Sequence, residues 1–144
     1  MTGSGSGVGP RVVRAEPAAI AIAVEGRPVA QVRMTRRGQW ADPAAQRYLD
    51  YRGTVQWAAR AAMAGRAPIV GPVGVRVEVF YAHSDLLHMR RGDADGILKT
   101  ICDGLNGVCY RDDRQVVEAG IGLHLADADG TTVLVWEAEE DARP

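Results

Sequence analysis

Five aspartates and one lysine are crowded into residues 90–115 of the 144-residue chain. They are Asp93, Asp95, Lys99, Asp103, Asp112 and Asp113. Carboxylates that are brought close together repel one another, and their pKa values rise unless a cation neutralises them. A site made only of oxygen ligands suits a hard divalent ion, of which Mg²⁺ is the most natural. The stretch therefore predicts a magnesium site.

A helix is expected to position these acids. The apolar residues in the stretch have the spacing of one buried helical stripe, and a Gly-Asn-Gly cluster follows them: Ile97, Leu98, Ile101, Cys102 and Leu105. Asp95, Lys99 and Asp103 form a second stripe on roughly the opposite side. Asp93 and Asp95 also suit a helix start on electrostatic grounds alone, so the later Asp112-Asp113 pair is what favours metal binding.

The same residues resemble the signature of the RusA-type Holliday-junction resolvases. That signature is Asp-x-Asp-Asn, a lysine shortly after it, Asp-x-Leu, and an Asp-Asp pair. Here it reads Asp93-Ala94-Asp95-Gly96, Lys99, Asp103-Gly104-Leu105 and Asp112-Asp113, followed by Gln115-Val116-Val117. One departure is Gly96, which stands where the family usually has Asn.

The resemblance implies a Mg²⁺-dependent endodeoxyribonuclease that resolves four-way DNA junctions by paired cuts in recombination and repair. The catalytic residues that it implies are Asp93, Asp95, Lys99 and Asp113, and the metal ligands are Asp93, Asp95, Asp113 and, as a helper, Asp112. Asp103 lies about 12 Å along the helix from Asp95 at ~1.5 Å per residue, so a structural role is expected for it. Because a junction has approximate two-fold symmetry, the expected assembly is a homodimer.

Arginines supply the expected DNA contacts. Gly26-x-Pro28, then Arg33-x-x-Arg36-Arg37 and a downstream Asp42-Pro43, are similar to the family's N-terminal segment. That similarity implies that Arg33, Arg36 and Arg37 contact the phosphate backbone. Arg90 and Arg91 lie beside the acid cluster and are expected near the scissile phosphate. Residues 11–66 carry ten arginines against four acids, whereas residues 67–144 carry seven basic residues against fourteen acids.

Composition indicates one ordinary globular domain, with 47% hydrophobic residues and a net charge of -1. We expect a flexible tail over 1–15, a nuclease domain over 16–138 and a frayed acidic tail over 139–144. The sequence has neither a long apolar run nor a signal peptide pattern, which favours a cytoplasmic protein without membrane contact. Cys102 and Cys109 are expected to be buried free thiols. The resemblance also suggests a phage or prophage context.

Hydrophobic periodicity predicts an α+β domain with a mixed β-sheet and packed helices, in the order β-α-β-α-β-β. Strands are expected over 17–24, 73–82, 115–125 and 131–136, with helices over 42–65 and after Asp93. The first helix is either continuous or hinged at Gly53. Tyr48, Tyr51 and Trp57 are expected to pack in the core rather than to stack on DNA bases. Asp129-Gly130 predicts that the last two strands form a hairpin.

Other functions remain as alternatives to junction cleavage. Gly96 is the one argument for a junction-binding protein that has lost nuclease activity. The same site could also serve a nuclease for flaps or other branched DNA. Asp127-Ala128-Asp129-Gly130-Thr131 looks like the first motif of haloacid-dehalogenase phosphohydrolases, but the chain after it is too short for their core. An EF-hand is excluded because Ile97 and Gly104 stand where calcium ligands are needed.

Overall fold

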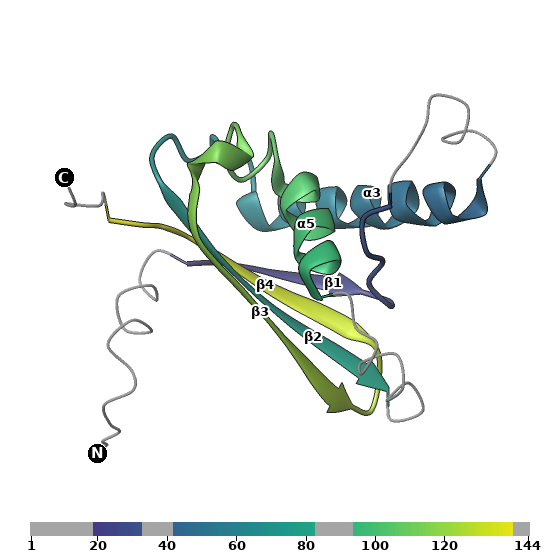
Figure 1. Ribbon diagram of the computed structural model, residues 1–144. Coiled ribbons are helices and arrows are strands. Elements are labelled where there is room, and N and C mark those ends of the chain that lie inside the picture. The colour runs from purple at the N-terminus through teal and green to yellow at the C-terminus, as the bar shows by residue number, and fades with distance from the viewer. Residues whose placement is uncertain (1–18, 33–41, 83–93, 140–144) are drawn as a thin grey trace, which may run out of the picture.

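The computed structural model describes residues 19–32, 42–82 and 94–139. Within them the chain forms four strands, two α-helices and one turn of 3₁₀ helix (Figure 1). In chain order these are β1 (Ile20–Glu25), α3 (Pro43–Met63), β2 (Val73–Ala82), α5 (Ala94–Leu105), η4 (Asp113–Gln115), β3 (Val116–Ala126) and β4 (Gly130–Glu137). The α+β class, the single domain and the order of elements are confirmed. The tail predicted over 1–15, and all of the tail predicted over 139–144 except Glu139, fall outside the described residues.

The strands form one mixed sheet in the order β1-β4-β2-β3. β4 is antiparallel to both of its neighbours, whereas β2 and β3 are parallel. A parallel pair needs a crossover connection, and α5 supplies it between β2 and β3. The end of β2 therefore leads into the acidic stretch, and the acidic stretch leads into β3.

The hairpin predicted for the last two strands is wrong. β3 is hydrogen-bonded to β2, and β4 is inserted between β1 and β2. Residues 127–129 carry the chain across the end of β2, where the backbone N–H of Ala82 donates a 2.9 Å hydrogen bond to the Asp129 carboxylate. Two strand spacings are only about 10 Å, which a short loop can cross. The Asp-Gly pair correctly indicated a turn, but local sequence cannot show that another strand lies between the two it joins.

Helix α3 begins where the sequence predicts. The Asp42 side chain accepts a hydrogen bond of 2.9 Å from the backbone N–H of Ala44, and Pro43 occupies the first turn. The helix runs through Gly53 without a break and ends at Met63, and Ala64 caps it with a left-handed backbone conformation. One face is buried, and its residues are Ala45, Tyr48, Tyr51, Val55, Ala59 and Met63.

Core packing is confirmed for Tyr48 and Tyr51 but is wrong for Trp57. The Trp57 side chain is 74% exposed on the outer face of α3. At 3.6 residues per turn, Trp57 is turned by roughly 200° from each of the buried residues Val55 and Ala59, so its side chain faces solvent. The expectation that Trp57 is buried rested on its aromatic side chain, although its position on the helix predicts exposure.

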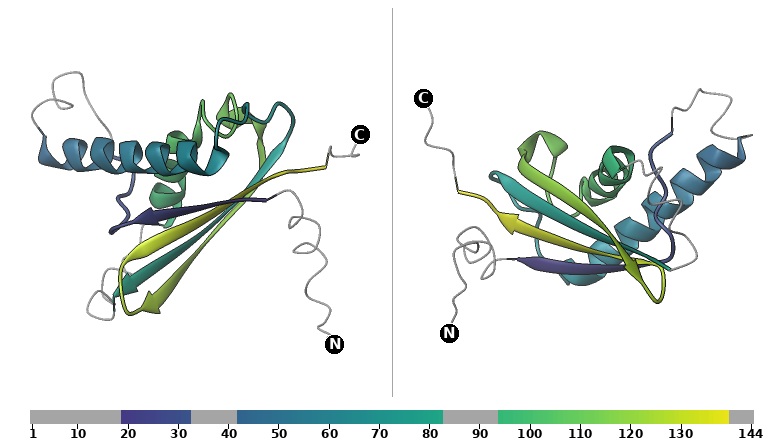
Figure 2. Two further views of the ribbon diagram at one scale, coloured as in Figure 1. Left: turned by 180° about the vertical axis from the view of Figure 1, so that it is seen from behind. Right: turned by 60° about the horizontal axis from the view of Figure 1, so that its bottom comes forward.

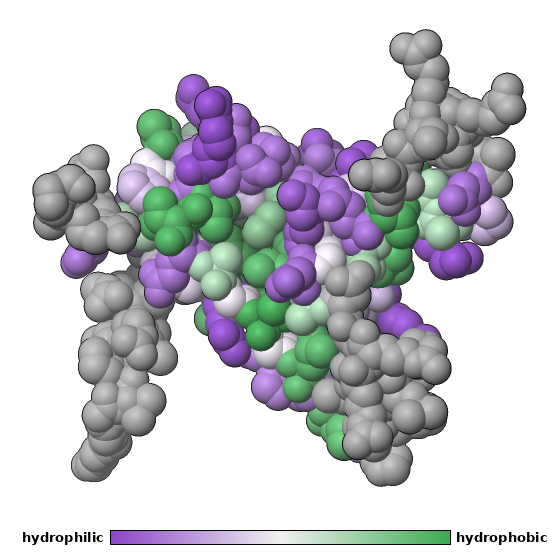
Figure 3. All heavy atoms as spheres, in the orientation of Figure 1, coloured by the Kyte–Doolittle hydropathy of each residue, from purple (hydrophilic) through white to green (hydrophobic). Residues whose placement is uncertain are grey.

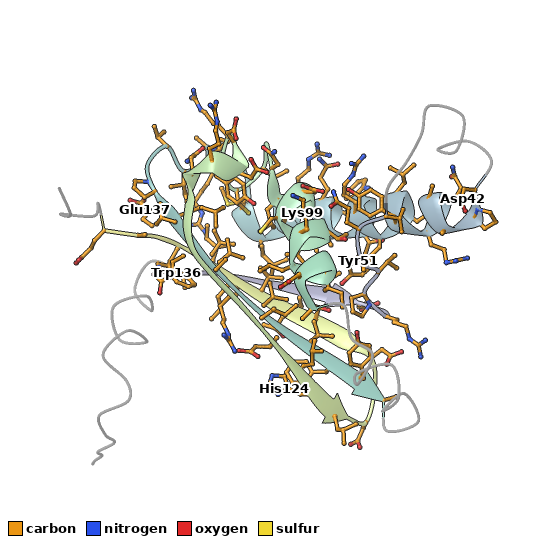
Figure 4. The ribbon with its side chains drawn as sticks, in the orientation of Figure 1. Asp42, Tyr51, Lys99, His124, Trp136 and Glu137 are labelled. Atoms are coloured by element: carbon orange, nitrogen blue, oxygen red, sulfur yellow. The ribbon has the colours of Figure 1, made fainter. Side chains whose placement is uncertain are left out.

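Both helices cover the same face of the sheet (Figures 1 and 2). Alternate strand residues point toward them and form the core, including Ile22, Val75, Val77, Val133 and Val135. Figure 4 shows Tyr51 between α3 and the sheet, and His124 on the face away from the helices. No helix in the described part of the chain is long and apolar enough to cross a membrane.

Candidate active site between α5 and β3

Helix α5 separates packing residues from charged ones, as the sequence predicts. Ile97, Ile101 and Leu105 are buried against the rest of the core. Asp95 and Lys99 are exposed, one helical turn apart, and Figure 4 shows Lys99 on the outward side of the helix. Asp95 lies in the first turn, where the free N–H groups and the helix dipole stabilise a carboxylate.

A shallow cavity of about 320 Å³ lies between α5 and the start of β3, and it brings the predicted acids together. Asp95 and Lys99 line it from α5, and Asp113 lines it from η4. Leu98, Cys102 and Val116 provide apolar walls. Asp95 and Asp113 are far apart in sequence, so the return of the chain after α5 is what places both carboxylates on one cavity.

Gln115 fixes the turn that presents Asp113. Its Oε1 atom accepts hydrogen bonds from the backbone N–H groups of Arg111 and Asp112, at 2.8 and 3.0 Å. Its Nε2 atom donates to the carbonyls of Ile69 and Gly71, both at 2.8 Å. One side chain therefore satisfies four backbone groups and ties the Asp112-Asp113 turn to the segment before β2.

Asp112 caps the short helix η4. Its Oδ1 atom accepts a 2.9 Å hydrogen bond from the backbone N–H of Arg114, and its Oδ2 atom lies 3.4 Å from Nη2 of Arg114. The backbone hydrogen bond from Arg114 lowers the pKa of Asp112, and the neighbouring Asp113 side chain adds to this shift. Asp112 therefore stays ionised beside Asp113, whose side chain lines the cavity.

Asp103 links α5 to two other segments. Its Oδ2 atom accepts hydrogen bonds from Tyr48 Oη at 2.9 Å and from Gln31 Nε2 at 3.1 Å. The backbone N–H of Gln31 also donates to the carbonyl of Gly96, at 3.1 Å. Gln31 is therefore attached to α5 at two points, directly before the arginine segment that begins at Arg33.

Several predicted site residues lie outside the described part of the chain. They are the candidate ligand Asp93 and the candidate DNA contacts Arg33, Arg36, Arg37, Arg90 and Arg91. Within the described residues no group of three or more acidic, His or Cys side chains could hold a metal ion. Three described carboxylates line the cavity, those of Asp95, Asp103 and Asp113.

The sequence reasoning missed the two glutamines that hold the site in place. Gln115 was noted only as part of a motif, and Gln31 was not noted at all. The only indication in the sequence was that both glutamines lie near motif residues. The spacing of a glutamine in the sequence does not reveal its hydrogen-bond partners. Cys102 and Cys109 are free thiols as expected, and burial raises the pKa of both.

Comparison with known proteins agrees with this arrangement. The family model described as Endodeoxyribonuclease RusA matches residues 25–135. The match includes the described site residues Asp95, Lys99 and Asp113 and most of the sheet. No curated protein matches the chain.

Proposed function

Because the chain belongs to the RusA endodeoxyribonuclease family, we propose that it cuts four-way DNA junctions at the cavity between α5 and β3, in a reaction that requires a divalent metal. One observation carries this proposal. Asp95 and Lys99 from α5 line the same cavity as Asp113 from η4. Carboxylates that can bind a metal ion, beside a lysine, are the groups that metal-assisted phosphodiester hydrolysis needs.

The donor set fits Mg²⁺. Asp95 and Asp113 offer exposed carboxylate oxygens on one cavity, and among the described residues that line it there is no imidazole and no pair of thiols that would favour zinc. We propose that Asp93, which precedes α5 directly, completes the set. A bound Mg²⁺ would polarise the scissile phosphate and lower the pKa of an attacking water. Asp112 would be a helper ligand, and its cap also holds the turn that carries Asp113.

The remaining side chains of the cavity have roles of their own. Lys99 is placed to stabilise the negative charge that develops on the phosphate. Leu98, Cys102 and Val116 would limit water access behind the phosphate, which strengthens the charge interactions there. Burial raises the pKa of Cys102, so its thiol stays protonated and is a wall rather than a nucleophile.

Phosphate contacts around the cavity are assigned to Arg33, Arg36, Arg37, Arg90 and Arg91. Gln31 supports this assignment for the first three, because it lies two residues before Arg33 in the chain and its backbone N–H bonds to the carbonyl of Gly96, next to Asp95. Arg90 and Arg91 stand three and two residues before Asp93 in the chain. The substrate would be branched DNA in the cytoplasm, bound by a homodimer whose two sites make the paired cuts.

The test is cleavage of a labelled synthetic four-way junction, beside a linear duplex and a flap, with Mg²⁺ or EDTA. Symmetric nicks on the junction alone, abolished by EDTA, are expected. Cleavage of the flap at an equal rate would replace junction resolution by a broader activity on branched DNA. Tight junction binding without cleavage would favour a binding protein without nuclease activity, and Gly96→Asn would then be the variant in which to look for recovered cleavage.

A further inference from the structure

β3 leaves an outer edge that no described strand covers. It is the last strand in the sheet order and extends over 11 residues, Val116–Ala126. Edge strands in natural proteins are usually kept short, or carry lysine or proline, because bare backbone N–H and C=O groups recruit other strands. β3 contains neither lysine nor proline, and its titratable side chains are Glu118 and His124. Such an edge is suited to pairing.

The residues of β3 are complementary to a reversed copy of themselves. We infer that β3 pairs antiparallel with β3 of a second copy of this chain, with Ile121 at the two-fold axis. This register places Glu118 opposite His124 of the second copy, and Gly120 opposite Gly122. Each match occurs twice, as a two-fold axis requires. A carboxylate facing an imidazole across a strand pair is a favourable match.

Exposed apolar residues fit the same register. Val117 and Leu125 are 59% and 47% exposed, and both lie near the ends of β3. Pairing about Ile121 brings Val117 of one copy toward Leu125 of the other, at both ends of the interface. Figure 3 shows hydrophobic surface gathered along the front of the sheet below α5, over β3. The interface would therefore cover side chains that a monomer leaves in water.

The face of β3 away from the helices is built to accept this contact. His124 bonds to Glu78 at 2.6 Å and stacks on Phe80 with ring centroids 5.1 Å apart. Glu78 in turn accepts a 2.6 Å hydrogen bond from Arg76. These side chains lie over Gly120 and Gly122, where an added Cβ would come within 2.8 Å of Arg76 and 2.6 Å of Glu78. His124 is thus held in a fixed position from which it can meet Glu118 of the second copy.

The pairing also sets the distance between the two active sites. Val116 lines the cavity and begins β3, so antiparallel strands place the two cavities at opposite ends of the paired ribbon. Ten residue steps at ~3.3 Å separate them by roughly 33 Å along the strands. This consequence rests on the proposed function, in which two equivalent sites act on one junction, whereas the interface itself is tested without DNA.

Sedimentation equilibrium at micromolar to tens of micromolar protein gives the first test. The wild type should have twice the 15.4 kDa mass of one chain. Leu125→Lys and Val117→Lys should each halve that mass. Each substitution puts one lysine from each copy into the apolar contacts of the interface. Trp57→Lys is a matched control at a position 74% exposed on the outer face of α3, away from β3, and should stay dimeric.

Cross-linking tests the register in a Cys102→Ser background. Ile121→Cys should cross-link to itself with a short bifunctional thiol reagent, whereas Ala119→Cys should not. A single-chain mass for the wild type would overturn the proposal. If removal of residues 1–18 then produced a dimer, the N-terminal segment would be the true occupant of the edge. A dimer that survives both lysine variants would also overturn the interface. Junction cleavage, measured separately, reports on the proposed function whatever the mass.

Discussion

The Tyr48 phenol donates a 2.9 Å hydrogen bond to the Asp103 carboxylate, across the contact between α3 and α5. The Arg52 guanidinium lies over the Tyr48 ring, 5.4 Å from its centroid, and Gln31 shares the same carboxylate oxygen. Asp103 is one helical turn beyond Lys99 on α5. The charged face of α5 is therefore oriented by a polar contact at one end as well as by its buried stripe.

Removal of this phenol should loosen α5. Tyr48→Phe is expected to lower the free energy of unfolding by about 1–3 kcal/mol, because the bond has a charged acceptor in a partly buried place. Urea unfolding measures the loss. Tyr51→Phe is the matched control, since its phenol bonds to the neutral Thr131 hydroxyl at 3.2 Å and should cost less. Equal losses of unfolding free energy in the two variants would show that the hydrogen bond to Asp103 stabilises the protein no more than the bond to Thr131.

Two glycines should respond to alanine in opposite directions. At Gly104 on α5, an added Cβ would lie 2.6 Å from Val55 Cγ1 and 3.1 Å from the Arg52 carbonyl, so Gly104→Ala should destabilise the protein by about 1–3 kcal/mol. At Gly53 in α3 nothing lies within 4 Å, so Gly53→Ala should stabilise by about 0.5–1 kcal/mol. Thermal unfolding checks both. A stabilising Gly104→Ala would mean that the helices do not approach this closely.

The Gln115 side chain should be needed for activity although it is not a metal ligand. Gln115→Glu keeps an acceptor for the N–H groups of Arg111 and Asp112 but cannot donate to the carbonyls of Ile69 and Gly71. We expect a loss of about 1–3 kcal/mol in stability and a lower kcat, since the turn that presents Asp113 is released. Gln56→Glu on α3 serves as the control. Wild-type stability and kcat for Gln115→Glu would refute this role.

Stability should fall in alkaline solution. Burial raises the pKa of Tyr51 to about 12, and burial also raises the pKa of Tyr48 and Tyr110. In the unfolded chain a phenol ionises at a pH of about 10. Above that pH the unfolded chain releases protons that the folded chain retains, so the free energy of unfolding declines as pH rises, by up to ~1.4 kcal/mol per pH unit for each phenol.

Urea midpoints measured at a series of pH values from 8 to about 11 check this decline. The decline should begin at a pH of about 8.5, where the unfolded chain starts to lose the thiol protons of Cys102 and Cys109, whose pKa values burial also raises, and it should steepen above a pH of about 10 as the phenols ionise. Tyr51→Phe should make the decline shallower. A flat profile across the alkaline range would show that the phenols ionise equally well in the folded protein.

Periodicity alone predicted most of the elements. β2 has the predicted bounds, Val73–Ala82, and α5 buries Ile97, Ile101 and Leu105 of the predicted apolar stripe, whereas Leu98 and Cys102 are half-buried at the cavity. These segments have strong period-2 or period-3.6 patterns, and tertiary contacts reinforce them. Trp57 and the supposed hairpin failed for a different reason. A residue's phase on a helix and the partner of a strand depend on contacts that are distant in sequence.

The sequence predicted which residues form the candidate site, but it did not predict the hydrogen bonds that hold them in place. The acids and Lys99 were found because charge repulsion and helical spacing make them conspicuous. The contacts that hold them come from Gln31, Tyr48 and the carbonyls of the segment before β2. These are single hydrogen bonds between segments that lie far apart in the chain, and no local pattern encodes them.

The most direct test of the central claim is whether Asp95 and Asp113 act as one site. Cleavage rates on a four-way junction with Mg²⁺ should be measured for Asp95→Asn, Asp113→Asn and the double variant. Asp127→Asn, an exposed acid in the β3–β4 turn, is the control and should cleave normally. If both carboxylates hold one metal, each single variant should lose about a hundredfold or more, and the double variant should be no slower than the worse single one. Losses that multiply in the double variant, or near-normal cleavage by either single variant, would contradict a shared metal site.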